Sequence, residues 1–582
     1  VLIQETPWVP AVGLGIALRL DGLALLFVLM ILCIGLLVII YARYYLAEQD
    51  PMGRFYAYLL LFMGAMLGMV MSENLLLLLM FWELTSISSF LLISYWRSLG
   101  EARQGARMAL AVTGGGGLAL LGGVLLLGHM TGSYELSVIL DSADLIHAHP
   151  LYVPALVLIL LGVFTKSAQF PFHFWLPHAL AAPTPVSAYL HSATMVKAGV
   201  FLLARLFPAL SDSAAWTWLV APTGAVTMLL GAYTALFRHD LKGLLAYSTI
   251  SHLGLITLLF GIGTPLAAVA AVFHIMNHAT FKASLFMAAG IIDHEAGTRD
   301  MRRLGGLWKF MPYTGALAMV AAAAMAGVPL LNGFLSKEMF FEKTVYMAQV
   351  AASAWVLPVV ATVAGALAVA YSIRFIHDVF FNGPGDLPRT PHEPVRWMKV
   401  PVEVLVVICV AVGIFPGITF GPLLAVAAGA TLNGPLPYFS LKVWHGFTPA
   451  LGMSALALLG GVLIYALRNP LFRLHDFVLG RVDARAMYVT VEGWLLGLAT
   501  WLNRLLHRPS LQRMTAVTLA ATAAALGFGL WGIELRGPAP PTPLDPLSLT
   551  AALCLAVGAI GTVILHRQRW TALVLLSVVG LI

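Results

Sequence analysis

Charged residues are scarce in this chain. Only 10% of its 582 residues are Asp, Glu, Lys or Arg, whereas 60% are hydrophobic. A soluble protein would carry about 25% charged residues, so the composition excludes a soluble enzyme and indicates a polytopic membrane protein. The net charge of +7 is spread over loops and never gathers into one domain, which argues against a nucleic-acid patch. Continuous apolar runs of about 20 residues predict helices, not a barrel.

Cysteine is nearly absent too. The three cysteines, Cys33, Cys409 and Cys554, each lie in an apolar run and have no metal-ligand spacing. They indicate small core residues and exclude a disulfide framework. The chain starts at Val1 without a basic leader and stops inside an apolar run, so we expect a segment of a longer protein.

The apolar runs predict about sixteen membrane helices. They fall near 22–40, 55–72, 74–94, 108–130, 152–170, 185–207, 216–236, 243–262, 266–291, 313–335, 352–378, 400–418, 447–467, 514–534, 546–566 and from 570. Short connections between them leave no room for a large domain outside the membrane. Within 471–513, apolar residues recur at i, i+3, i+4 and i+7, which is typical of an amphipathic helix at the membrane surface.

Basic loops alternate with loops that lack lysine and arginine. The loop 95–107 carries three arginines, the next loop 131–151 carries neither residue, and the alternation continues to 567–569. Basic loops stay on the cytoplasmic side. We therefore expect a multi-pass protein of the inner (plasma) membrane, with the N-terminus of this segment outside.

Two lysines stand beside interruptions in long apolar runs. Pro171 follows Lys166, and Pro329 and Gly333 precede Lys337. A lysine at membrane depth costs about 2.5–3.5 kcal/mol even on lenient scales, and a proline frees a backbone carbonyl. The two breaks lie five predicted helices apart, and this odd offset reverses orientation. The pattern indicates inverted repeats with sites at their broken helices.

One carboxylate lies in the centre of the run 74–94. Burial favours the protonated form of Glu83 unless a cation lies near, so a Glu–Lys pair would bind a proton with an affinity that depends on its partner. The alternative is a static ion pair. In the run 185–207, His191 and Lys197 lie six residues apart, about 120° around a regular helix, and so would face different neighbours.

The run 266–291 carries a stripe of titratable residues. His274, His278 and Lys282 are spaced four apart and share one helix face, which suits proton relay. Polar packing and a zinc site are the alternatives, although no third zinc ligand is evident. Lys242 directly precedes the run 243–262, which carries His252, and Lys242 could also extend to the membrane surface.

Several longer motifs carry a family resemblance. They are Phe81-Trp82-Glu83, Thr165-Lys166-Ser167-Ala168-Gln169, Ala182-Pro183-Thr184-Pro185-Val186-Ser187-Ala188, His191-Ser192-Ala193-Thr194-Met195-Val196, Leu241-Lys242-Gly243-Leu244-Leu245-Ala246-Tyr247-Ser248, His278-Ala279-Thr280-Phe281-Lys282 and Gly333-Phe334-Leu335-Ser336-Lys337-Glu338. In this order they resemble the antiporter-like proton-pumping subunits of complex I. Within that superfamily the chain is most similar to the A-type subunits of the Mrp multisubunit sodium/proton antiporters, strongly over about 20–470.

The resemblance implies an all-α, antiporter-like fold whose two inverted five-helix repeats contain broken helices, with a C-terminal amphipathic lateral helix and extra membrane helices. Its proton-path residues match Glu83, Lys166, His191, Lys242, His278, Lys282 and Lys337. One position departs from the complex I pattern: an Arg–x–x–Asp pair is expected where this chain has Thr113 followed by four glycines ending at Gly117. A charged pair partner for Glu83 or Lys166 is therefore not expected there.

The expected domain organisation combines these features. It comprises 1–54, an N-terminal membrane helix that follows two family helices missing from this segment; 55–207, the first inverted repeat; 208–380, the second; 381–470, C-terminal core helices; 471–513, the lateral helix; and 514–582, the start of a C-terminal membrane extension.

These expectations define a function. We predict a proton-translocating subunit that exports Na⁺ in exchange for H⁺, works with other small membrane subunits, binds no nucleic acid and is a transporter rather than an enzyme. The predicted path residues are Glu83, Lys166, His191, Lys197, Lys242, His252, His274, His278, Lys282 and Lys337. The alternatives are a proton-pumping subunit of a redox complex and a scaffold subunit that does not titrate. No quinone, flavin or iron–sulfur signature is present, so no cofactor is expected, and the sodium site is not disclosed.

Overall fold

The computed structural model describes residues 1–9, 11, 13–350, 355–478, 484–506, 511–531 and 545–581. The chain divides into two units, Val1–Ala484 and Arg485–Ile582, and each is considered by itself. Parts of the predicted lateral helix and of the predicted extension, at 479–483, 507–510 and 532–544, lie outside the described residues.

The first unit begins with an antiparallel β-hairpin that the all-helical prediction missed. Strand β1 (Leu2–Val9) pairs with β2 (Leu14–Leu20). Buried and exposed residues alternate along β2, the two-residue period of a strand with one covered face. Seven residues are too few for this alternation to stand out beside the apolar run that follows. Asp21 then caps the first helix, accepting a hydrogen bond from the Ala24 N–H (2.9 Å).

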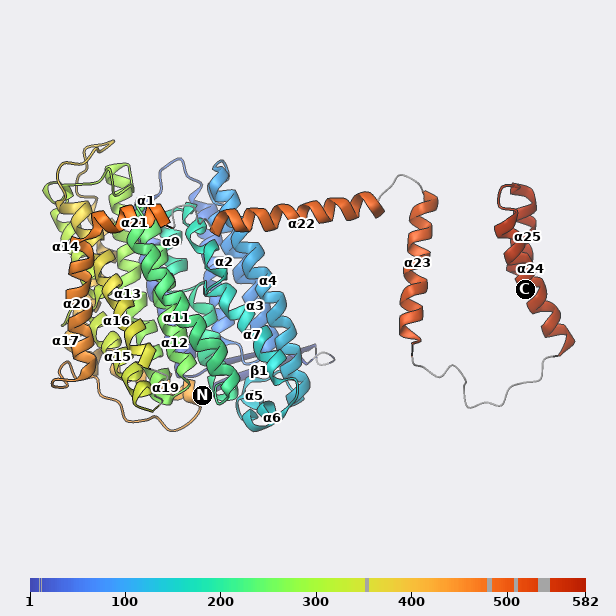
Figure 1. Ribbon diagram of the computed structural model, residues 1–582, viewed down its shortest axis with the longest axis horizontal. Helices are drawn as coiled ribbons and strands as arrows, with labels where there is room; N and C mark the ends of the chain where they lie inside the picture. The colour runs from blue at the N-terminus through green and yellow to red at the C-terminus, as the bar shows by residue number, and fades with distance from the viewer. Residues whose placement is uncertain are drawn as a thin grey trace. The chain divides into compact units, whose positions relative to one another are not determined.

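Helices form the rest of the first unit (Figure 1). Up to residue 210 they are α1 (Gly22–Tyr45), α2 (Met52–Met71), α3 (Leu75–Ile93), α4 (Gly100–Thr131), α5 (Leu136–Leu140), α6 (Ala143–Ala148), α7 (Tyr152–Lys166), α8 (Trp175–His178), α9 (Thr184–Ser192) and α10 (Lys197–Leu210). There follow α11 (Ala214–Phe237), α12 (Leu241–Ile262), α13 (Pro265–Ala296), α14 (Pro312–Ala326), α15 (Asn332–Val350), α16 (Val356–Ile376), α17 (Arg396–Ile414), α18 (Pro416–Thr419), α19 (Gly421–Leu432), α20 (Pro449–Ala466) and α21 (Arg468–Val478).

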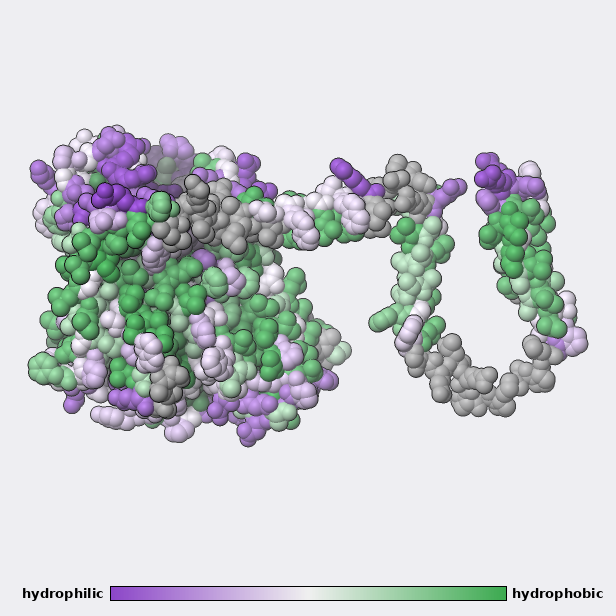
Figure 2. Space-filling model, in the orientation of Figure 1, coloured by the Kyte–Doolittle hydropathy of each residue, from purple (hydrophilic) through white to green (hydrophobic). Residues whose placement is uncertain are grey.

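The remaining helices are α22 (Ala484–Leu506), α23 (Leu511–Gly529), α24 (Pro546–Ile564) and α25 (Arg569–Leu581). Within the described residues, 11 helices are long and apolar enough to cross a membrane. Figure 2 shows the matching surface on the first unit, a hydrophobic band between two more hydrophilic ends. The chain is a multi-pass membrane protein, as its composition predicts.

Helices α12 and α13 form the centre of the first unit. Along α12, every residue of the apolar window is buried, and α13 is buried along nearly its whole length. Both have low amphipathicity because their apolar residues occur on all faces, the pattern of a helix surrounded by other helices. The polar side chains on α12 and α13 are therefore held inside the protein.

Among the described residues, several predicted runs are interrupted, including 400–418 at Phe415. The run 152–170 ends as a helix at Lys166, and the run 313–335 is split between Ala326 and Asn332, where Leu330 adopts a left-handed backbone (φ 68°). Each of these two breaks contains the proline that predicted it. The run 185–207 is also split, at 193–196, which was not expected.

The interruption at 193–196 corrects the predicted geometry of one pair. The Thr194 hydroxyl donates to the Tyr189 carbonyl (2.8 Å), and the Val196 N–H reaches back to the Leu190 carbonyl (3.3 Å). These contacts replace regular i→i−4 bonds, so the chain forms a wide turn. The 120° separation calculated for His191 and Lys197 on a continuous helix is therefore wrong.

A buried chain of lysines and histidines

Lys166 ends α7 and reaches across to α3. Its ammonium donates to the Trp82 carbonyl (3.1 Å) and to the Ser86 hydroxyl (2.7 Å), and its side chain is fully buried. Glu83 follows Trp82 on the same helix, and the charges of Glu83 and Lys166 interact. Among the described residues the two do not form a direct ion pair within 4.0 Å. Lys166 is therefore near Glu83, as expected, yet bonded to neutral acceptors.

The glycine run on α4 makes room for the Glu83 carboxylate. A Cβ atom on Gly117 would overlap Glu83 Oε1, and one on Gly116 would overlap the Thr165 hydroxyl. Glu83 Oε1 is buried without a hydrogen-bond partner. The position where complex I relatives are expected to carry charge thus holds bare backbone, against which the carboxylate packs.

Ser167 connects Lys166 to the break between α9 and α10. The Ser167 hydroxyl donates to the Val196 carbonyl (2.6 Å) and accepts from the Val200 N–H (3.1 Å). The next residue after Val196 is Lys197, whose ammonium donates to the Ile275 carbonyl of α13 (2.7 Å). Lys197 is fully buried, so it joins the first half of the chain to the central helix α13.

Three histidines from two helices meet at the centre of the unit. A hydrogen bond joins His252 Nδ1 on α12 to His274 Nε2 on α13 (3.0 Å), and His274 Nδ1 is bonded to the Ser336 hydroxyl of α15 (2.9 Å). The ring of His278 lies 5.4 Å from that of His252. The Tyr371 hydroxyl on α16 approaches His252 Nε2 at 3.5 Å. The predicted stripe on α13 is thus part of a cluster that four helices share.

The last two lysines of the predicted path, Lys282 and Lys337, both contact Met325. Lys282 donates to the Ser248 hydroxyl and contacts the Met325 sulfur (3.2 Å). Lys337 donates to the Met325 carbonyl (2.8 Å) and the Ala326 carbonyl (3.0 Å). Both ammonium groups therefore gather at the broken end of α14, without a carboxylate in contact among the described residues.

Two predicted residues lie apart from this sequence of contacts. Lys242 is buried near the start of α12 and forms an ion pair with Asp293 at the far end of α13 (3.8 Å). His191 is fully buried on α9, and neither ring nitrogen has a hydrogen-bond partner. Its ring lies 6.0 Å from that of Phe286 on α13. Among the described residues, no group of three His, Cys, Asp or Glu is placed so that it could hold a metal ion.

Several participants were not predicted. Ser86, Ser248 and Met325 are partners of the lysines, Ser336 and Tyr371 are partners of the histidines, and Ser167 bonds the Val196 carbonyl. A signal existed for two, since a serine adjoins both Lys166 and Lys337 in the sequence. Buried polar atoms without a protein partner line the same region, on Gln169, Asn277, His278 and Asn332. Buried polar groups are normally hydrogen-bonded, so bound water is the partner expected for them.

Glu338 is a further unpredicted carboxylate. It follows Lys337 on α15 and is 8% exposed. Glu338 lines a cavity of about 440 Å³ between α15 and the segment 438–450, together with Glu342 and His445. A cavity of this volume, lined by two carboxylates and a histidine, can hold water. Its residue Glu338 directly follows Lys337 of the predicted path.

An acidic cluster near the hairpin is fully engaged. Asp21 is bonded to Arg205 (Nη2–Oδ1, 3.0 Å) and to Arg19 (Nε–Oδ2, 2.8 Å), and Arg19 also bonds Glu73 (3.0 Å). Burial raises the pKa of Asp21, but the hydrogen bonds and charge of Arg205 outweigh it and hold that pKa well below its ordinary value. Asp21 is therefore a structural partner of two arginines, not a free ligand for sodium.

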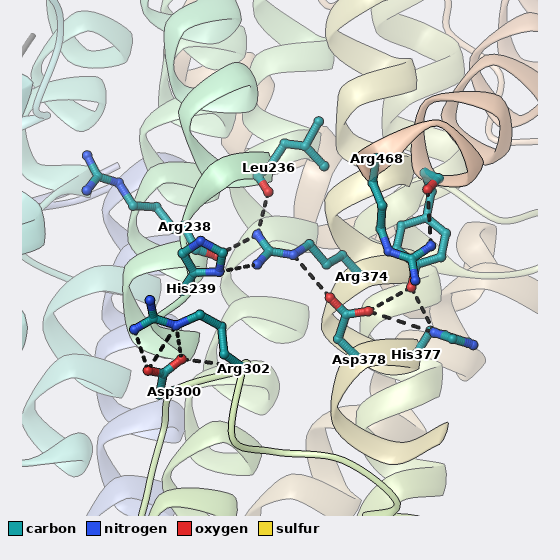
Figure 3. A network of polar contacts seen from close by, with 10 residues as sticks. Leu236, Arg238, His239, Asp300, Arg302, Arg374, His377, Asp378 and Arg468 are labelled. Carbon is teal, nitrogen blue, oxygen red and sulfur yellow. Dashed lines mark hydrogen bonds and ion pairs between the residues drawn. The ribbon is translucent and has the colours of Figure 1, made fainter. Parts of the chain in front are cut away.

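A second arginine network lies around Arg374 in the other half of the first unit (Figure 3). Arg374 on α16 donates to the Leu236 and Arg238 carbonyls, to His239 (2.9 Å) and to Asp378 (3.2 Å). The Tyr465 hydroxyl of α20 donates to Asp378 (2.8 Å). Burial and the charges of Arg374 and Arg302 hold the pKa of His239 below its ordinary value. This network fixes α16 to the α11–α12 loop and to α20.

Comparison with known proteins agrees with this architecture. Residues 72–367 match the family described as NADH:quinone oxidoreductase/Mrp antiporter, TM, and residues 8–56 match NADH-ubiquinone oxidoreductase (complex I), chain 5 N-terminus. The second match includes β2 and the last two residues of β1.

Named relatives are similar over much of this chain. A probable K⁺/H⁺ antiporter A/B subunit of Rhizobium meliloti (strain 1021) is 55% identical over 601 aligned positions, covering 100% of this chain and 59% of that protein. The A subunit of a Na⁺/H⁺ antiporter of Alkalihalophilus pseudofirmus is 43% identical over 530 positions, covering 84% of this chain and 66% of that protein.

A solved structure gives the same result for the fold. A chain in the structure of the Mrp complex from Dietzia sp. DQ12-45-1b matches with a TM-score of 0.83 and 35% identity, covering 100% of this chain and 63% of that chain. This chain therefore spans about three fifths to two thirds of the length of these relatives. The predicted antiporter-like fold and the resemblance to the A-type Mrp subunits are confirmed, and the chain belongs to the NADH:quinone oxidoreductase/Mrp antiporter family of membrane proteins.

Proposed function

We propose that this chain is the proton-translocating part of an antiporter complex of several subunits that exchanges protons for sodium or potassium. The observation that carries the proposal is the line of buried lysines. Lys166, Lys197, Lys282 and Lys337 are at most 6% exposed, and each donates to a carbonyl or a hydroxyl group. Ionisable residues at membrane depth are costly and default to transport roles.

The proposed path runs from Glu83 to the end of α14. Protons pass between Glu83 and Lys166, along the Ser167 contact to Lys197, and then to α13. From there His274, His278 and His252 connect to Lys282 and Lys337. Histidine is suited to relay because small changes in its surroundings change its charge. Lys242 and His191 are proposed to exchange protons with the path from the side. Lys242 lies beside Asp293, and His191 lies beside α13.

The proposal extends to ions, partners and location. The relatives' names include both sodium and potassium, so either ion is a candidate for this chain; our sequence-based expectation is sodium. Other small membrane subunits are the proposed partners, by analogy with the Mrp complex. The alternation of basic loops supports the plasma membrane, with the N-terminus of this segment outside.

The test is proton movement in inverted vesicles that contain the complete complex. With an imposed pH gradient and without an electron donor, adding Na⁺ or K⁺ is expected to dissipate the gradient. Glu83→Gln and Lys166→Ala are expected to abolish the response, whereas Lys309→Ala, at an exposed position, serves as the matched control.

Two outcomes would contradict the proposal. A gradient that responds only when a respiratory electron donor is present would assign the chain to a redox complex. Wild-type exchange in both path variants would make it a scaffold subunit.

A further inference from the structure

The broken end of α14 presents two carbonyl groups that its own helix leaves without partners. In a regular helix the Met325 carbonyl would accept from the N–H of residue 329, but that residue is Pro329, which has none. The Ala326 carbonyl is the last of the helix. The Lys337 ammonium donates to both carbonyls (2.8 and 3.0 Å). A positive charge therefore occupies a pair of freed backbone oxygens inside the membrane.

A side-chain oxygen without a hydrogen-bond partner lies at the start of α15, directly after this break. Asn332 begins α15, and its side chain is fully buried. Its amide nitrogen donates to the Thr280 hydroxyl (2.8 Å), while its oxygen Oδ1 has no hydrogen-bond partner. Freed carbonyls and amide oxygens are the ligands that discontinuous membrane helices use for alkali cations.

Lys337 also has room to move. Its side chain lines a cavity of about 20 Å³, together with Ser251, His252 and Tyr371, and a space of this size holds about one water molecule. Gly327 lies against the lysine stem, since a Cβ there would lie 2.8 Å from Lys337 Cδ. This small cavity adjoins the Lys337 side chain and offers the ammonium a position away from the carbonyls.

The groups around Lys337 leave the site without a counter-ion. From α12 it is faced by His252, from α13 by His274 and Lys282, and from α16 by Tyr371. On its own helix, Glu338 lines the larger cavity with His445. In the described part of the chain, no carboxylate is within ion-pair distance of Lys337, so the carbonyl oxygens are what stabilises its charge.

We propose that the Met325 and Ala326 carbonyls form an alkali-cation site for which Na⁺ or K⁺ competes with the Lys337 ammonium. When the Lys337 side chain moves from the carbonyls into the small cavity, one cation takes its place on the carbonyls. The two carbonyls hold one positive charge before and after, so binding there exchanges one alkali cation for one ammonium group. This assignment rests on the proposed antiport function and adds the location at which the two ions meet.

The other break does not have this property. There the Ser167 carbonyl precedes Pro171 by the same four residues, but the neutral amide of Gln169 donates to it (2.9 Å). Lys166 donates instead to α3. An alkali cation replacing a neutral amide would add a charge to a buried site, which is costly. Lys166 variants are therefore a matched control.

The experiment measures binding of ²²Na⁺ and, as a potassium analogue, ⁸⁶Rb⁺ to the purified complete complex. In the wild type, acidification is expected to weaken binding by up to about tenfold per pH unit, because the Lys337 ammonium and the metal ion compete for the same carbonyls. In Lys337→Met the carbonyls lack their competitor, and binding is expected to persist at low pH. Lys166→Met is expected to keep the wild-type pH dependence.

A second variant keeps the test independent of the lysine. Pro329→Ala restores an N–H four residues after Met325 that can extend α14 and compete for the Met325 carbonyl, so it is expected to weaken cation binding about tenfold or more. Cation binding that depends on pH equally in Lys337→Met and the wild type, or that is unchanged in Pro329→Ala, would overturn the site. Since binding is measured apart from transport, a complex that exchanges ions yet fails this test would leave the antiport function standing.

Discussion

The two broken helices use the same backbone defect in different ways. Each has a proline four residues after a carbonyl, at Ser167 and Pro171 in one and at Met325 and Pro329 in the other. In the first break the neutral Gln169 amide donates to the freed carbonyl, and Lys166 is bonded to α3 beside Glu83. In the second break the lysine itself donates to the freed carbonyl.

This difference follows from where each lysine stands. Lys166 is the last residue of the helix before its break, whereas Lys337 lies in the second turn of the helix after its break. A side chain before the break points away from it to the neighbouring helix, and one after the break can reach back. Lys166 therefore lies close to a carboxylate, whereas Lys337 bonds backbone oxygens. We propose that these oxygens can also hold a metal ion.

The largest expected effect is loss of transport at either lysine. Lys166→Ala and Lys337→Ala are each predicted to lower cation-driven proton movement by about 10³-fold, the middle of the range for loss of a proton-transfer group. Vesicle fluorescence assays measure it, with Lys309→Ala as control. The comparison breaks down if either variant retains wild-type exchange, because both stations are proposed to lie on one path.

The ion pairs of Asp21 with Arg19 and Arg205 are predicted to contribute most to the stability of the first half of the unit. Asp21→Asn leaves the buried Arg205 without its carboxylate and is expected to cost about 3–5 kcal/mol. The native pKa of Asp21 is lowered, so its stabilisation is present above the unfolded value of about 3.9 and is lost as pH falls through the native value.

Thermal unfolding of the complex at neutral and acidic pH measures this contribution. The matched control is Asp300→Asn, which removes a pair to the exposed Arg302 and is expected to cost less than about 1 kcal/mol. Equal losses in the two variants would show that the buried pair is dispensable.

The neutral donor of the first break is predicted to be structural. Gln169→Leu leaves the Ser167 carbonyl without a partner, which is expected to cost about 1–3 kcal/mol of stability. Cation binding should stay unchanged, because no alkali site is proposed at this break. A change in the pH dependence of ²²Na⁺ binding in this variant would remove the distinction between the two breaks.

The glycine run beside Glu83 gives a finer test of the first site. Gly117→Ala forces the Glu83 carboxylate to shift, at an expected cost of about 1–3 kcal/mol for overpacking and with reduced transport. Gly114→Ala is the control, since a Cβ there meets nothing within 4 Å. If both variants transport equally well, the position of the carboxylate against α4 is unimportant.

The smallest effect is expected in the network around Arg374. The pKa of His239 is lowered, so its contribution to stability is present above the unfolded value of about 6.5 and is lost as pH falls through the native value. Solvent screening limits this to less than about 1 kcal/mol. Arg302→Ala should move the pKa of His239 back toward its ordinary value, measured by histidine hydrogen exchange. An unchanged or lower pKa would contradict the assigned cause.

Much of the site could be predicted because its signals are local. A lysine beside a proline in an apolar run indicates a broken helix, and the four-residue spacing from His274 to Lys282 places three groups on one face. Partners on other helices carried no such signal. Nothing in the run 243–262 indicates that His252 would bond His274, and Met325 is an ordinary apolar residue until Lys337 reaches its carbonyl.

The sequence by itself determined the membrane class, the positions of the two proline breaks and the identities of the buried charges, because hydrophobicity and backbone hydrogen bonding act along the chain. It did not determine the β-hairpin. It also did not determine the turn at 193–196, where hydrogen bonds between nearby residues interrupt the predicted helix. Tertiary structure alone decided which oxygens face each lysine. Those contacts depend on how separate helices pack, and the difference between Lys166 and Lys337 lies there.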